Sequence, residues 1–99
     1  MFNLDLKDKV ILITGGSDGL GYASAELLSS EGAKVIICGR RGDYLSEKAK
    51  TISENTNNNV LAIQADVSKA EDCKRLVEET ISKFKKIDIL VNNAGASAA

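Results

Sequence analysis

The chain of 99 residues contains no histidine and no proline, and it has only two cysteines. Within these residues, the lack of histidine excludes Ser-His-Asp and Cys-His nucleophiles and removes the commonest metal ligand, so we expect no metal site. Without proline, no helix is interrupted by one. Cys38 and Cys73 form no CxxC pair, so we expect buried thiols in a reducing cytosol rather than a redox pair or a zinc site.

The chain also has no large excess of charge of either sign, because it contains 13 Lys and Arg and 14 Asp and Glu, which give a net charge of −1. No basic stripe is present, so we expect neither nucleic acid nor an anionic membrane as a partner. No run approaches the ~18 apolar residues of a membrane span, and the N-terminus lacks the regions of a signal peptide. Composition and length therefore predict a cytoplasmic globule of one domain at most.

Short aliphatic runs alternate with helix-length segments along the chain. The strand-like runs are Val10–Thr14, Lys34–Cys38, Val60–Ala65 and Ile87–Asn92. Because each is nearly all aliphatic, they suit a parallel sheet that is covered on both faces. With right-handed crossovers, this alternation predicts an α/β fold. We expect part of a Rossmann-type doubly wound parallel sheet, with four strands in the order 3-2-1-4, three helices, and a ligand-binding switch point between strands 1 and 4.

Three segments have helical patterns. The first, Leu20 to Glu31, carries apolar residues at Leu20, Ala23, Leu27 and Leu28 and stops at Gly32, a frequent helix terminator. The second, about Asp43 to Glu54, has a weaker stripe. The third has the clearest apolar stripe, which consists of Cys73, Leu76, Val77, Thr80, Ile81 and Phe84. We expect Ser68 to cap this third helix, with Glu71 completing a capping box.

The first strand leads into a glycine-rich turn, Thr14-Gly15-Gly16-Ser17-Asp18-Gly19-Leu20-Gly21. A strand, a glycine turn and a helix place free N–H groups and a helix N-terminus against a pyrophosphate. Gly15 would allow the tight turn, Gly19 a close approach of backbone to phosphate, and Gly21 close packing of the helix on the sheet. The turn therefore predicts dinucleotide binding, and the alternative is a turn that only connects strand to helix.

Two other glycine loops fit less well. A triphosphate-binding P-loop needs Lys and Ser or Thr after its last glycine, whereas Tyr22 and Ala23 follow Gly21 here. A methyltransferase loop usually has an acidic residue at the end of the strand, where this chain has Thr14.

The TGxxxGxG spacing resembles that of the short-chain dehydrogenase/reductase family. Two further motifs, Asp66-Val67 and Asn92-Asn93-Ala94-Gly95, follow later strands in the family's order, so the resemblance covers essentially the whole chain. It implies that the pyrophosphate and adenosine ribose are lined by Gly15, Ser17, Asp18, Gly19, Leu20 and Gly21. It also implies that Asp66 and Val67 meet the adenine and that Asn93, Ala94 and Gly95 border the two riboses. Alternatively, Asn92 and Asn93 only close hydrogen bonds at a strand end.

Cofactor choice depends on the end of the second strand. NAD needs a carboxylate there for the ribose 2′-OH, and NADP needs an arginine for the 2′-phosphate. Gly39 stands where the acid would be, and Arg40 and Arg41 follow it. Guanidinium–phosphate contacts are strong, so we expect NADP(H), with NAD(H) as the alternative if both arginines are merely solvated. Asp18 opposes this prediction, because many NADP-preferring relatives have a basic residue there; it would repel the 2′-phosphate or simply cap the following helix.

The family's reaction uses a serine and a YxxxK pair, in which the tyrosine gives or takes the proton. Tyr44 and Lys48 have this spacing but follow the second strand, whereas the family's pair follows the fifth, so we assign no catalytic residue. We expect residues 1–99 to be the N-terminal part of a single NAD(P)-binding Rossmann domain in a longer protein, inactive when alone.

The resemblance implies an NADP(H)-dependent oxidoreductase that interconverts a carbonyl and an alcohol by hydride transfer. Its partners would be a small-molecule substrate and copies of itself, in a homodimer or homotetramer. The alternative is a non-catalytic dinucleotide-binding module or an inactive fragment.

Overall fold

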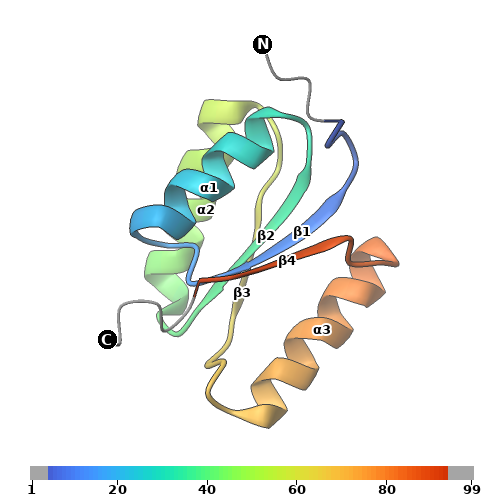
Figure 1. Ribbon diagram of the computed structural model, residues 1–99. Helices are drawn as coiled ribbons and strands as arrows, with labels where there is room; N and C mark the ends of the chain where they lie inside the picture. The colour runs from blue at the N-terminus through green and yellow to red at the C-terminus, as the bar shows by residue number, and fades with distance from the viewer. Residues whose placement is uncertain (1–4, 94–99) are drawn as a thin grey trace.

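Four parallel strands and three helices alternate along the chain in the computed structural model, which describes residues 5–93. The elements are β1 (Val10–Thr14), α1 (Gly19–Ser30), β2 (Lys34–Gly39), α2 (Gly42–Thr56), β3 (Leu61–Gln64), α3 (Ala70–Phe84) and β4 (Ile89–Asn92). The sheet order is β3-β2-β1-β4, with every pairing parallel (Figure 1). The expected Rossmann-like fold and strand order are confirmed, and most element boundaries differ by one or two residues from those expected.

The sheet is covered on both faces: α1 and α2 lie on one side and α3 lies on the other (Figure 1). Ile11 and Ile13 of β1 belong to the core on the α1 and α2 side, and Val10 and Leu12 belong to the core on the α3 side. All five residues of β1 are buried. This two-sided burial is the reason that the strand is a continuous aliphatic run rather than an alternating one.

The buried face of α1 differs from the one that its large apolar residues indicated. Leu20 is 74% exposed and Leu27 is 59% exposed, whereas Gly21, Ala25 and Ser29 are buried. These three small residues are spaced four apart and so lie on one face of the helix. At these positions the helix lies so close to the sheet that only small side chains fit, while Tyr22 and Leu28 are half-buried and also pack against this core. As expected, the helix ends before Gly32, which has a φ of +91°.

Helix α3 buries only part of its expected stripe. Leu76 and Thr80 are buried, whereas Val77 and Ile81 are 45% and 40% exposed. The apolar stripe therefore correctly indicates the face of α3 that turns toward the sheet. However, residues 5–93 leave part of this stripe exposed to solvent.

The expected capping box of α3 is wrong. The N-cap residue is Lys69, and its side chain makes no capping hydrogen bond. The hydroxyl and amide of Ser68 instead donate to Oδ1 of Asp66, at 2.7 and 3.0 Å. A carboxylate two residues away is a strong local acceptor, and it competes successfully for the serine.

The two cysteines are free thiols in different environments. Cys38 is fully buried, and burial raises the pKa of its thiol. Cys73 is half-buried, and its thiol donates to the carbonyl oxygen of Val67 at 3.2 Å. Among residues 5–93, no helix is both long and apolar enough to span a membrane.

Candidate functional site

The expected site residues gather where the parallel strands end. Gly15 follows β1, Gly39 ends β2, Asp66 follows β3, and Asn93 follows β4. The carboxyl ends of these strands lie together at the lower left of Figure 1, beside the start of α1. In open α/β sheets, ligands bind outside this end, at the point where the strand order reverses. Here that point lies between β1 and β4.

The glycine turn has the backbone geometry that its glycines predicted. Gly15 has a φ of +69° and Gly19 a φ of +55°, a region that favours glycine. Apart from its chain neighbours and the backbone of its own helix, no atom of residues 5–93 lies within 4 Å of the position that a Cβ on Gly19 would occupy, so the backbone there faces open space. Asp18 stands at the N-cap of α1 without a capping hydrogen bond from its side chain. The first N–H groups of the helix are thus left available to an external acceptor.

A small hydrogen-bond network holds the turn against the end of β4. The amide of Asn93 donates to the hydroxyl of Thr14 at 2.9 Å, and the Thr14 hydroxyl donates to Oδ1 of Asn92 at 3.1 Å. The side-chain nitrogen of Asn93 donates to the Gly15 carbonyl at 3.3 Å. A Cβ on Gly21 would collide with that carbonyl oxygen and lie 2.7 Å from the Asn93 nitrogen. Asn92 and Asn93 therefore have a structural role at the strand end.

Asp66 presents an ionised carboxylate at the end of β3. Hydrogen bonds from the Ser68 hydroxyl and then from its amide hold the pKa of Asp66 below its usual value, with smaller contributions from Lys69 and Arg40. Both Ser68 bonds go to Oδ1. Oδ2 accepts no hydrogen bond within residues 5–93, so it can accept one from a ligand. The Ala65 amide donates to the Gly39 carbonyl at 2.9 Å, so Arg40 and Asp66 follow neighbouring strand ends.

The two arginines after β2 differ in their surroundings. The Arg40 side chain is exposed, and its guanidinium makes no ion pair or hydrogen bond with another described residue. The Arg41 guanidinium lies 3.8 Å from Oδ2 of Asp18 and 4.3 Å above the centre of the Tyr44 ring. A Cβ on Gly39 would be 3.9 Å from the Ser17 hydroxyl. The end of β2 therefore lies next to the glycine turn.

Tyr44 and Lys48 are not arranged as a proton-transfer pair. The Tyr44 hydroxyl donates to Oδ1 of Asp18 at 2.6 Å. The Lys48 amine lies 5.1 Å from the centre of the Tyr44 ring and 5.2 Å from that of Tyr22, so it faces ring surfaces. This arrangement offers no support for a catalytic role of the YxxxK spacing.

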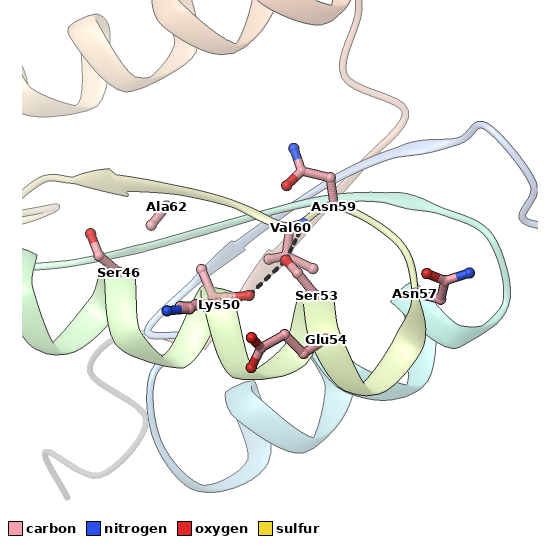
Figure 2. Close-up of a pocket in the computed structure, with 9 residues that line it drawn as sticks. Ser46, Lys50, Ser53, Glu54, Asn57, Asn59, Val60 and Ala62 are labelled. Carbon is pink, nitrogen blue, oxygen red and sulfur yellow. Dashed lines mark hydrogen bonds between the residues drawn. The ribbon is translucent and has the colours of Figure 1, made fainter.

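A hollow of about 560 Å³ lies elsewhere, along α2 and β3 (Figure 2). Lys50, Ser53 and Asn59 are among its lining residues, and none of the expected site residues lines it. The Ser53 hydroxyl donates to the Ala49 carbonyl and accepts from the Val60 amide, so this polar group is already satisfied. The hollow is open and has no helix N-terminus, so we prefer the strand ends as the candidate site.

Comparison with known proteins identifies the chain. The family model described as short chain dehydrogenase matches residues 9–99. The chain belongs to the short-chain dehydrogenase family.

Proteins with similar sequences include plant and bacterial enzymes. An 11-beta-hydroxysteroid dehydrogenase A from Sesamum indicum is 40% identical over 95 residues, which are 96% of this chain and 27% of that protein. An uncharacterized oxidoreductase from Staphylococcus saprophyticus is 45% identical over 92 residues, 93% of this chain and 39% of that protein. The chain thus spans between a quarter and two fifths of the length of these relatives.

A solved structure of the same family shares the fold. The L-sorbose reductase from Gluconobacter frateurii, complexed with NADPH and L-sorbose, superposes with a TM-score of 0.87 at 40% identity. The match covers 93% of this chain and 36% of that one.

Within the described residues, the structure brings together most of the expected site residues and reveals some that the sequence analysis missed. Ala94 and Gly95 lie outside the described residues, whereas Asn92 and Asn93, the rest of their motif, lie within them. The sequence analysis noted Thr14 only as the first residue of the glycine motif. In the structure, its hydroxyl is the centre of the hydrogen-bond network between β1 and β4. Gly16 is close-packed, because a Cβ there would lie 2.5 Å from the Ile37 side chain. Its sequence signal is weak, since the constraint comes from the neighbouring strand. No group of three potential metal ligands occurs in the same part of the chain.

Proposed function

We propose that this chain is the cofactor-binding portion of an NADP(H)-dependent oxidoreductase that interconverts a carbonyl and an alcohol. One observation carries the choice of cofactor: Arg40, whose guanidinium has no partner among the described residues, directly follows Gly39 at the end of β2. We also propose a small-molecule substrate and a homodimer or homotetramer for the whole protein.

The site has the features that a dinucleotide needs. The open backbone at Gly19 and the uncapped start of α1 suit a pyrophosphate, which accepts N–H bonds and favours the positive end of a helix dipole. Oδ2 of Asp66 suits the amino group of an adenine. The residues proposed to line the cofactor site are Gly15, Ser17, Asp18, Gly19, Leu20, Gly21, Arg40, Arg41, Asp66, Val67, Asn93, Ala94 and Gly95.

A 2′-phosphate fits the end of β2 better than a 2′-hydroxyl. No carboxylate stands at Gly39 to accept a bond from a ribose hydroxyl, and Arg40 offers a forked cation that matches a phosphate. The NADPH bound to the L-sorbose reductase supports the same choice. When bound, the nicotinamide supplies or accepts the hydride. We assign no proton-transfer residue to this chain. We propose that the residues that transfer the proton lie in a segment that corresponds to the part of the relatives that this chain does not span.

The decisive variant is Arg40→Ala, with calorimetric titration of NADPH and NADH into the purified protein. Losing a charge-assisted contact should weaken NADPH binding by roughly 1.5–3 kcal/mol and leave NADH nearly unchanged. The matched control is Lys83→Ala, which removes an exposed cation from the last turn of α3, away from the carboxyl ends of the strands (Figure 1). Equal losses for both cofactors after Arg40→Ala would remove the 2′-phosphate role.

The converse variant is Gly39→Asp, which introduces the missing carboxylate. A Cβ at this position would make only ordinary contacts, 3.5 Å from Leu45 and 3.9 Å from Ser17, so the backbone tolerates a side chain there. We expect it to weaken NADPH and strengthen NADH. If neither cofactor binds the unmodified protein, the chain is a fragment without this function. If the cofactors bind but the whole protein, including the part beyond these residues, reduces no carbonyl substrate, it is a non-catalytic binding module.

A further inference from the structure

Asp18 is a difficulty for any site that takes a 2′-phosphate. Its carboxylate lies in the glycine turn, its side chain is 64% exposed, and it does not cap α1. A negative charge there would repel a doubly negative phosphate nearby, by an amount that depends on how far the charge is neutralised. The protein therefore needs a local cation if it is to bind NADP(H).

Both oxygens of this carboxylate are engaged by the start of α2. Oδ1 accepts the Tyr44 hydroxyl at 2.6 Å, and Oδ2 lies 3.8 Å from the Arg41 guanidinium. The guanidinium in turn lies over the Tyr44 ring at 4.3 Å. Asp18, Arg41 and Tyr44 thus close a ring of three mutual contacts, which we name the Asp18 cluster. It joins the glycine turn to α2.

The two adjacent arginines are consequently unequal. The charge of Arg41 is opposed by Asp18 within the Asp18 cluster, whereas Arg40 has no partner among residues 5–93. Exposed ion pairs contribute little to folding stability. The pair of Asp18 and Arg41, with side chains 64% and 72% exposed, is therefore expected to affect the binding of an anion more than the stability of the fold.

We propose that Arg41 is a positioning residue for cofactor selection that acts through Asp18: it cancels the Asp18 charge, so that Arg40 alone contacts the 2′-phosphate. The inference rests on the proposed NADP(H) function. Tyr44 holds the carboxylate in place, with its hydroxyl bonded to Asp18 and its ring under Arg41. The Asp18 cluster thereby lets a glycine turn with an acidic residue accept a phosphorylated cofactor.

A double-mutant cycle in the purified protein tests the proposal, with NADPH and NADH affinities as the readout. Arg41→Ala leaves Asp18 uncompensated and should weaken NADPH about three- to thirtyfold, with a much smaller effect on NADH. Asp18→Asn alone should leave NADPH binding unchanged or improve it. The double variant should return to within about twofold of the unmodified protein, because the repulsion and its cancellation are removed together.

Two results would overturn the proposal. If the double variant binds NADPH as weakly as Arg41→Ala alone, Arg41 contacts the phosphate directly. If Arg41→Ala binds NADPH normally, the Asp18 cluster has no role in selection. Failure of the proposed function has a different signature, because the unmodified protein would then bind NADPH no better than NADH, and Arg40→Ala would change neither.

The role of Tyr44 is tested with Tyr44→Phe, which keeps the ring and removes the hydroxyl. It should weaken NADPH in the unmodified background and have no effect in the Asp18→Asn background. Tyr22→Phe is the matched control, because the Tyr22 hydroxyl makes no hydrogen bond within the described chain while its ring also lies near Lys48. Thermal unfolding of each variant should be unchanged, and an equal loss in both backgrounds would contradict the role.

Discussion

Gly21 is the residue at which the fold and the candidate site constrain each other most directly. Its missing side chain allows α1 to lie against the Gly15 carbonyl and the Asn93 amide, the same groups that shape the glycine turn. A single methyl group there must displace either the helix or the turn. Arg40 and Arg41 also differ at this scale, since Arg41 pairs with Asp18 whereas the Arg40 guanidinium has no partner among the described residues.

Gly21→Ala should destabilise the protein by roughly 1–3 kcal/mol, because the added Cβ overpacks a contact made of backbone. It should also weaken NADPH, since the displaced turn presents its N–H groups differently. Urea unfolding and calorimetric titration measure the two effects. The control is Gly42→Ala, where a Cβ would make an ordinary contact at 3.5 Å with the Gln64 side chain. A neutral Gly21→Ala would show that α1 can move away at no cost.

At the scale of the elements, Asp88 links the start of β1 to the segment before β4, at the edge of the sheet opposite the candidate site. Its Oδ2 accepts the amide of Val10, the first residue of β1, at 2.8 Å, and lies 3.1 Å from the Lys86 amine. The Val10 amide, and then Lys86, hold the pKa of Asp88 below its usual value of 3.8. The ionised carboxylate is thus preferred in the folded state, where it links β1 to the segment before β4.

Asp88→Asn should lower stability at neutral pH, and the deficit should shrink in acid. Because the folded pKa lies below the unfolded one, this contribution is fully present above the unfolded value and is lost as the pH falls through the folded value. Urea unfolding of both proteins at pH 7 and at steps below 3.8 measures the deficit. Asp5→Asn is the control, because Asp5 is exposed with no ion pair among the described residues. A deficit independent of pH would mean that the carboxylate charge is irrelevant.

The molecule as a whole leaves one apolar surface uncovered by residues 5–93. Leu90 is 60% exposed, and its register with Leu12 turns it toward the α3 side of the sheet, where Val77 and Ile81 are also exposed. Strand β4 pairs only with β1 in the described part of the chain. An unpaired edge with large apolar side chains favours association.

Residues 1–99 produced alone should therefore self-associate, and Leu90→Lys should reduce this association. Sedimentation velocity over a range of concentrations measures it. Ser82→Lys adds the same charge at an exposed position on α3 and should have little effect. If the unmodified segment stays monomeric at high concentration, the Leu90 surface does not drive association.

Much of the fold and part of the candidate site could be predicted from the sequence, because the relevant constraints are local. A strand buried on both faces must be an aliphatic run, and the runs at β1 and β2 show this without reference to the rest of the chain. Likewise, Gly15 and Gly19 stand where φ is positive, a requirement of the backbone itself. The sequence by itself therefore determined the order of elements, the α/β class and the position of the glycine turn.

Only the tertiary structure decided the features that depend on distances between separate elements. The close approach of α1 to the sheet decided that Ala25 and not Leu27 is buried. The proximity of α2 to the glycine turn decided that Arg41 pairs with Asp18, a residue 23 positions earlier, while Arg40 remains unpaired among the described residues. Neighbouring arginines have the same propensities and the same charge, so no local rule separates them. Their surroundings differ because folding brings a carboxylate to Arg41 and not to Arg40.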